Sequence, residues 1–165
     1  MRLGEALRRS YSLLLFLFGP AHTGPESWES PLCRRVRMDV DKQVEYWTTG
    51  SAEDLVAAET LLEKSCLRQG LFFVHLALEK MLKALVIRAT SDVPPRIHNL
   101  VRLAQLAGLE INNEQERFLR RFDLYQLEGR YPDSQQVALD PDLARQELQK
   151  ATEVWQWLKA QSSTL

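Results

Sequence analysis

Apolar residues recur every three or four positions in five stretches of the chain, which is the spacing of one buried face of an α-helix. The stretches cover about residues 40–66, 71–90, 98–106, 113–129 and 141–158. From Met38 onward nothing alternates with period two over a useful length, so no β-strand is expected. The pattern predicts an all-α protein, and the short connections favour an up-and-down bundle of four to five antiparallel helices.

Capping residues support several of these helix boundaries. Asn113, with Glu116 three positions later, is an asparagine variant of the capping box for the fourth helix. Asp140 is expected to cap the fifth helix, with Pro141 in the first helical position. Within the first helix, the pair Gly50-Ser51 is a weak point where a bend or a restart is expected.

The second predicted helix is apolar around most of its circumference, which is typical of a helix buried inside its bundle. His75, Glu79 and Lys83 are exceptions that follow one another at four-residue spacing, so they form one polar stripe, with Lys80 beside it. Glu79 before Lys83 is the favourable order for an ion pair within a helix. The stripe has two interpretations: a structural strip of paired polar groups, or part of a binding site.

Residues 1–37 differ in character from the rest. Arginines precede the apolar run Leu13 to Phe18, and a stretch rich in Gly, Pro and Ser follows, which is the outline of a signal peptide. The run is too short to span a bilayer as a helix. We favour a disordered extension or a mis-called start over export, because Met38 opens a normal polar helix entry and no disulfide framework follows. The expected helical bundle therefore covers residues 38–165.

The composition limits the classes of function. The 165 residues suffice for one domain, and 45% of them are apolar, enough for a core. The net charge of −1 provides no global basic field for nucleic acid and leaves open only a small local basic site. Cys33 and Cys66 fit no zinc or redox motif and are expected to be free thiols in a reducing cytoplasm. The three histidines lie far apart in sequence, so neither a metal nor a cofactor is expected.

Three segments in order carry a family resemblance. They are the helix from Phe73 to Leu85, the loop and helix start from Pro94 to Leu100, and the turn from Gly129 to Asp133. Together with the predicted bundle they resemble a HEPN domain, over about residues 39–158. The resemblance implies a four- or five-helix bundle that is often a homodimer. It also implies one of two functional types: a metal-independent ribonuclease, frequently a toxin, or the partner of a small nucleotidyltransferase encoded beside it in a toxin–antitoxin-like pair.

The ribonucleases of this family use an arginine and a histidine separated by four to six residues. In this chain no histidine follows Arg130, and His98 has no arginine correctly spaced before it. Arg68 and His75 fit the spacing, but they stand in the second predicted helix rather than late in the domain. Ribonuclease activity therefore stays open.

A candidate binding site follows if the stripe of the second helix meets the two loop motifs in one cleft. Its residues are His75, Glu79, Lys80, Lys83, His98, Arg130 and Tyr131. Lysine and arginine hold phosphate, histidine moves a proton near neutral pH, and tyrosine stacks on a base. Structural roles compete with this interpretation: His98 is placed to cap or pack at a helix start, and Arg130 to pair with Asp133.

The sequence thus predicts a nucleotide- or RNA-binding HEPN protein that pairs with a nucleotidyltransferase, forms a homodimer and has no membrane association. A metal-independent ribonuclease toxin is the first alternative, with a histidine as general acid or base and Arg130 stabilising the phosphorane charge. A helical assembly module without a small ligand is the second.

Overall fold

A computed structural model describes residues 38–130 and 139–162 of the chain. Five α-helices and no strand occupy these ranges, which confirms the predicted all-α class. The helices are α1 Val40–Glu63, α2 Leu67–Thr90, α3 Leu100–Leu106, α4 Asn113–Arg130 and α5 Pro141–Gln161. The expectations for residues 1–37, for Tyr131 and for the side chain of Arg130 lie outside what the structure describes.

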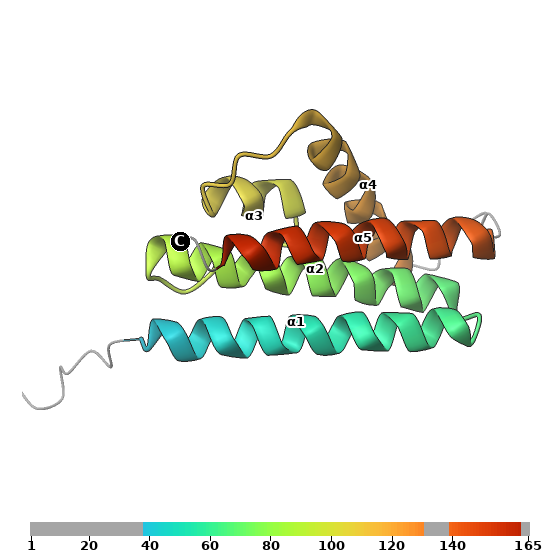
Figure 1. Cartoon of the computed structure of the whole chain (residues 1–165), viewed down its shortest axis with the longest axis horizontal. Helices are drawn as coiled ribbons and strands as arrows, with labels where there is room; N and C mark the ends of the chain where they lie inside the picture. Colours follow the sequence, from blue (N-terminus) through green and yellow to red (C-terminus); the bar gives the residue numbers. More distant parts are fainter. Residues whose placement is uncertain (1–37, 131–138, 163–165) are drawn as a thin grey trace, which may run out of the picture. The chain divides into compact units, whose positions relative to one another are not determined.

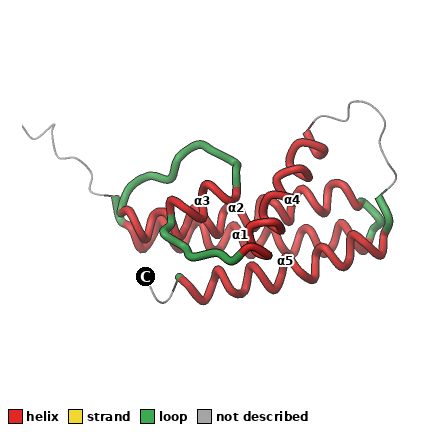
Figure 2. Tube along the Cα trace, turned by 90° about the horizontal axis from the view of Figure 1, so that it is seen from above, coloured by secondary structure: helices red, strands yellow, loops and turns green. Residues whose placement is uncertain are grey.

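The central element is α2, against which each of the other four helices packs. Figure 1 shows α1, α2 and α5 side by side as three long helices, with α3 and α4 together on one side of them. The tight turn after α1 makes α1 and α2 antiparallel, and α5 runs in the same direction as α2. In Figure 2, which looks from above, α4 crosses the long helices at a steep angle.

Burial on nearly every side explains the composition of α2. Its large apolar residues are enclosed by the neighbouring helices, and with Phe118, Leu119 and Phe122 of α4 and Leu158 of α5 they form the core. Fully burying one such side chain stabilises the fold by about 1.5–3 kcal/mol. Because α2 has almost no side that faces solvent, a polar side chain on it is buried, and burial without a hydrogen-bond partner costs free energy. The polar residues of α2 are therefore expected to find partners inside the bundle.

The expected weak point at Gly50-Ser51 is wrong, because α1 continues through it without a break. The Ser51 hydroxyl donates to the carbonyl oxygen of Ala77 at 2.5 Å. Nε1 of Trp155 donates to the same hydroxyl oxygen at 2.7 Å. The small polar residue thus joins α1, α2 and α5 at one buried point.

Helix α2 begins at Leu67, four residues before the expected start, and the cap of α4 and the start of α3 differ from prediction by one and two residues. Asn112, not Asn113, caps α4: its Oδ1 accepts from the backbone N–H groups of Glu114 and Gln115 at 2.9 Å, and the Gln115 side chain accepts from Asn112 N at 2.9 Å. This is the reciprocal capping box, one residue earlier than predicted. The start of α3 shifts too, because Asn99 supplies its cap and His98 stays in the loop before it.

The predicted cap of α5 is confirmed, with Asp140 accepting from the Asp142 N–H and Pro141 in the first turn. Among the described helices, none combines the length and the low charge needed to cross a membrane.

Candidate functional site

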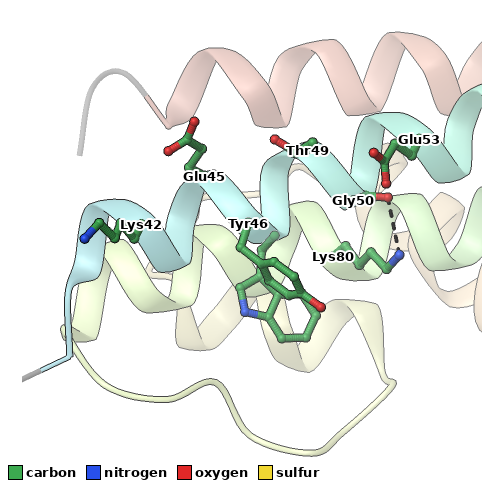
Figure 3. Close-up of a pocket in the computed structure, with 8 residues that line it drawn as sticks. Lys42, Glu45, Tyr46, Thr49, Gly50, Glu53 and Lys80 are labelled. Carbon is green, nitrogen blue, oxygen red and sulfur yellow. Dashed lines mark hydrogen bonds between the residues drawn. The ribbon is translucent and has the colours of Figure 1, made fainter. Parts of the chain in front are cut away.

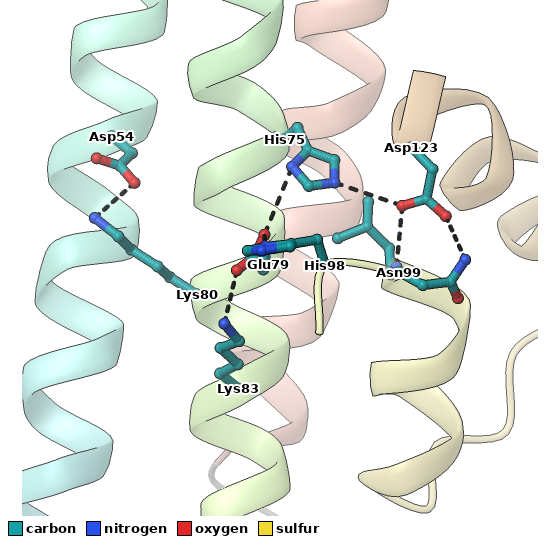
Figure 4. Close-up of polar contacts among 9 residues, drawn as sticks. Asp54, His75, Glu79, Lys80, Lys83, His98, Asn99 and Asp123 are labelled. Carbon is teal, nitrogen blue, oxygen red and sulfur yellow. Dashed lines mark hydrogen bonds and ion pairs between the residues drawn. The ribbon is translucent and has the colours of Figure 1, made fainter. Parts of the chain in front are cut away.

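Three polar side chains of α2 form a buried stripe that faces α4 and the loop before α3 (Figure 4). His75 is fully enclosed, and Glu79 and Lys83 are buried. About one helical turn separates each from the next, so they share one face, as the spacing predicts. The stripe belongs to the interior of the bundle and is not a surface strip.

Glu79 is the centre of the stripe. Its Oε1 accepts a hydrogen bond from Nζ of Lys83 at 2.7 Å, and its Oε2 lies 3.0 Å from Nδ1 of His98. Burial raises the pKa of the Glu79 carboxyl, but the hydrogen bonds from Lys83 and His98 outweigh it and bring the pKa below its usual value. The carboxylate is therefore ionised at neutral pH and can only accept hydrogen bonds, so Nδ1 of His98 donates to it.

His98 is where this cluster reaches solvent. Its side chain is 43% exposed, against 6% for Glu79 and 8% for Lys83. Since Nδ1 is held by Glu79, the tautomer of the neutral ring is fixed and Nε2 is the ring atom left to react or to bind. Nε2 has no hydrogen-bond partner among the described residues. Capping of α3 falls to Asn99, so that competing explanation of His98 is set aside.

Asp123 of α4 supplies a second carboxylate that the sequence did not single out. Its Oδ1 accepts from the backbone N–H of Leu100 at 3.0 Å, and its Oδ2 accepts from the Asn99 side-chain amide at 2.9 Å. The two carboxylates thus anchor consecutive residues of one loop, Glu79 holding His98 and Asp123 holding Asn99 (Figure 4). This double anchor fixes the loop that presents the His98 ring.

His75 lies between the two carboxylates. Its Nε2 is 3.4 Å from Oδ1 of Asp123, and its Nδ1 is 3.8 Å from Oε2 of Glu79. Neither ring nitrogen makes a hydrogen bond. Because the ring has no exposed surface, a ligand in solution has no direct access to it, and contact of His75 with a ligand stays a prediction.

The two lysines of α2 are engaged in different places. Lys83 pairs with Glu79, and its Nζ lies 5.2 Å from the centroid of the Trp47 ring, a cation–π arrangement. Lys80 points to α1 instead, where its Nζ forms an ion pair with Asp54 at 2.7 Å. The structure therefore brings Glu79, Lys83 and His98 together and leaves Lys80 outside the cluster.

Sequence reasoning missed Asp123 because its partners are 23 and 24 positions away in the chain. One local sign was present: Asp123 stands four residues after the buried Leu119, at the edge of the apolar face of α4, where a charged side chain tends to be paired. Within the described ranges, no three His, Cys, Asp or Glu side chains are grouped closely enough to hold a metal ion.

Comparison with known proteins identifies the family of this bundle. A family model described as the HEPN domain matches residues 44–161, a range that contains α2 to α5, most of α1 and every residue of the site. No curated protein and no solved structure matches the chain.

Proposed function

The chain belongs to the HEPN family, and from that premise we propose that it binds a nucleotide or an RNA phosphate at His98 and works as the partner of a small nucleotidyltransferase. One observation carries the proposal: a solvent-facing imidazole whose inner nitrogen is held by a buried, ionised carboxylate. A ring held in this way presents Nε2 in one orientation. When neutral it accepts from a base or ribose, and when protonated it donates to a phosphate oxygen.

Arg130 and Tyr131 complete the proposed contact with the ligand. Asp123 ties α4 to the loop that carries His98, and Arg130 is the last residue of the same helix, seven positions further on. We include Arg130 in the proposed site because the turn from Gly129 to Asp133 is one of the three segments that carry the family resemblance. A guanidinium there holds phosphate with two parallel hydrogen bonds, and Tyr131 offers a ring for base stacking.

Binding of AMP and of a short single-stranded RNA, followed by calorimetry, tests the proposal. The variant His98→Ala is expected to lose about tenfold or more in affinity, since it removes a charge-assisted hydrogen bond. The matched control is Val93→Ala, an exposed residue of the same loop that makes no polar side-chain contact. Equal affinity of wild type and His98→Ala would show that His98 is not the binding residue.

A metal-independent endoribonuclease is the second candidate, and the same carboxylate–imidazole pair favours it. An imidazole oriented by a carboxylate is the usual arrangement of a general acid or base, worth about 10²–10⁴ in rate. Incubation with RNA in the presence of EDTA separates the two functions. Cleavage that is lost in His98→Ala supports the nuclease, whereas binding without cleavage supports the first proposal.

The partner and the oligomeric state need their own measurements. Light scattering after gel filtration measures whether the chain is the expected homodimer, and co-expression with a neighbouring nucleotidyltransferase measures the pairing. If neither AMP, ATP nor RNA raises the melting temperature, a ligand-free assembly module becomes the better account, because specific ligands stabilise the native state by mass action.

A further inference from the structure

A groove of about 590 Å³ runs along the outer side of α1, and none of its lining residues belongs to the Glu79–His98 cluster. We call it the α1 groove. Its walls come from the first half of α1 and from Lys80 of α2 (Figure 3). In that view Glu45 and Glu53 rise along one edge, and the Tyr46 ring lies along the other.

The lysines that line the α1 groove are paired with carboxylates, but its glutamates are not. Lys42 pairs with Asp39 at 3.2 Å, and Lys80 pairs with Asp54 at 2.7 Å. Lys80 also donates to the carbonyl oxygen of Gly50 at 3.3 Å, so both cations of the groove are already neutralised. By contrast, Glu45 and Glu53 form no ion pair or hydrogen bond with any described side chain. The uncompensated charge of the groove is therefore negative.

The exposed Tyr46 ring adds a second attraction for cations. Tyr46 is 71% exposed, and its ring stands edge-on to that of Trp47 at 5.9 Å between centroids. The face of an aromatic ring attracts ammonium and guanidinium groups, and the effect adds to the attraction of nearby carboxylates. Phosphate is repelled by the same carboxylates, so the groove does not suit a nucleotide or RNA.

A second exposed apolar side chain lies further along α1, beyond the groove. Val56, ten residues after Tyr46 and 63% exposed, lies on the outer side of α1. Ten residues of helix cover about 15 Å, the length of roughly three turns of a docked helix. Tyr46 and Val56 thus place two exposed apolar or aromatic side chains on either side of the unpaired Glu53. Such spaced contacts suit a protein segment better than a small cation.

We propose that the α1 groove binds an arginine or lysine side chain on a basic, amphipathic segment of a partner protein. The inference rests on the proposed function in one respect, that the chain works with a protein partner, and it names the chemistry that the partner presents. Glu45 and Glu53 pair with the cation, the Tyr46 ring covers its apolar stem, and Val56 meets an apolar residue further along the segment.

The probe is a synthetic helical peptide of about 15 residues, long enough to reach from Tyr46 to Val56, with arginines beside a stripe of leucines. Its glutamine-for-arginine version is the peptide control. We expect the double variant Glu45→Gln/Glu53→Gln to bind the arginine peptide about tenfold more weakly, and Tyr46→Ala severalfold more weakly. The glutamine peptide should bind weakly to all forms.

The matched control is Glu110→Gln/Glu153→Gln, which removes two exposed carboxylates that lie outside α1 and its groove. It should leave the affinity within about twofold of wild type, since exposed charges away from the contact contribute little. Equal weakening by both double variants would mean general charge attraction and would overturn the proposal. So would full displacement of the peptide by spermidine at matched charge, which would identify a small polyamine as the ligand.

AMP binding measured on the same variants separates this inference from the proposed function. Groove variants that lose the peptide and keep AMP support both. Normal peptide binding by Glu45→Gln/Glu53→Gln, with AMP still lost in His98→Ala, contradicts the α1 groove and leaves the proposed function standing. Intact groove behaviour with no AMP or RNA binding in any form contradicts the proposed function alone.

Discussion

Glu79 shows how one buried carboxylate can serve structure and site at once. It neutralises Lys83 inside the bundle and fixes the ring of His98 at the surface. Its charge is stable there because two donors offset the cost of burial. The neighbouring His75 ring is fully buried, and neither of its nitrogens makes a hydrogen bond. The nearby carboxylates of Glu79 and Asp123 are therefore the groups that offset the cost of burying these nitrogens.

Removing the charge of Glu79 is expected to destabilise the fold strongly. Glu79→Gln leaves the Lys83 ammonium buried without a counter-charge, which costs about 3 kcal/mol in free energy of unfolding. Urea denaturation measures this loss. The double variant Glu79→Gln/Lys83→Met serves as the control and should recover most of the stability, because it removes both charges together. No recovery in the double variant would mean that the two residues do not act as a pair.

The lowered pKa of Glu79 also sets a pH dependence. A carboxyl whose pKa is lower in the folded state stabilises the protein above its unfolded pKa, which is ordinarily about 4.5. This contribution is lost as the pH falls through the folded pKa. Wild type should therefore lose stability more steeply on acidification below about pH 4.5 than Glu79→Gln does. Parallel urea midpoints across that range measure the difference, and identical slopes would contradict it.

At the scale of elements, close approach of α1 and α2 depends on small residues at defined positions. Gly70 lies against the end of α1, where an added Cβ would stand 2.7 Å from Cγ of Leu62 and 3.3 Å from the Ala58 carbonyl oxygen. Ser51 makes the corresponding contact in the middle of the pair. Both residues look like helix weakeners in the sequence, and both permit helix packing in the structure.

Gly70→Ala gives a test in which two effects have opposite signs. Helix propensity alone would stabilise the variant by about 1 kcal/mol. The steric clash of the added Cβ with Leu62 is expected to outweigh this gain and to destabilise the protein by about 1–3 kcal/mol, because a packed core side chain can move only slightly. Thermal unfolding measures the sign. Making the change in a Leu62→Ala background should reduce the penalty, and a stabilised single variant would contradict the packing seen here.

At the scale of the whole molecule, local patterns predicted what local physics determines. Apolar periodicity located the five helices, and the Asp140 cap was foreseen because its partner is two residues away. The buried stripe of α2 was also foreseen, since three residues on one helix share a face regardless of the fold. These features need only the geometry of a single helix.

What the sequence did not predict depends on distant pairs. Asp123 meets Leu100 across 23 positions, and Trp155 meets Ser51 across 104. The destination of Lys80 was missed for the same reason, because only the packing of α1 on α2 decides whether it meets Glu79 or Asp54. Periodicity carries no information about which helix faces are opposed, so the loop anchor and the α1 groove emerge only in three dimensions.

Nitrogen-15 NMR of the histidine rings tests the central claim, that buried Glu79 holds His98 as the ligand-binding ring. In wild type we expect His98 to be protonated on Nδ1 when neutral, and its Nε2 resonance to shift when AMP or a short RNA is added. Spectra of His98→Ala assign the signal, and those of Glu79→Gln should show the tautomer preference lost. A His98 ring protonated on Nε2, or an Nε2 resonance that no nucleotide or RNA moves, would contradict the account.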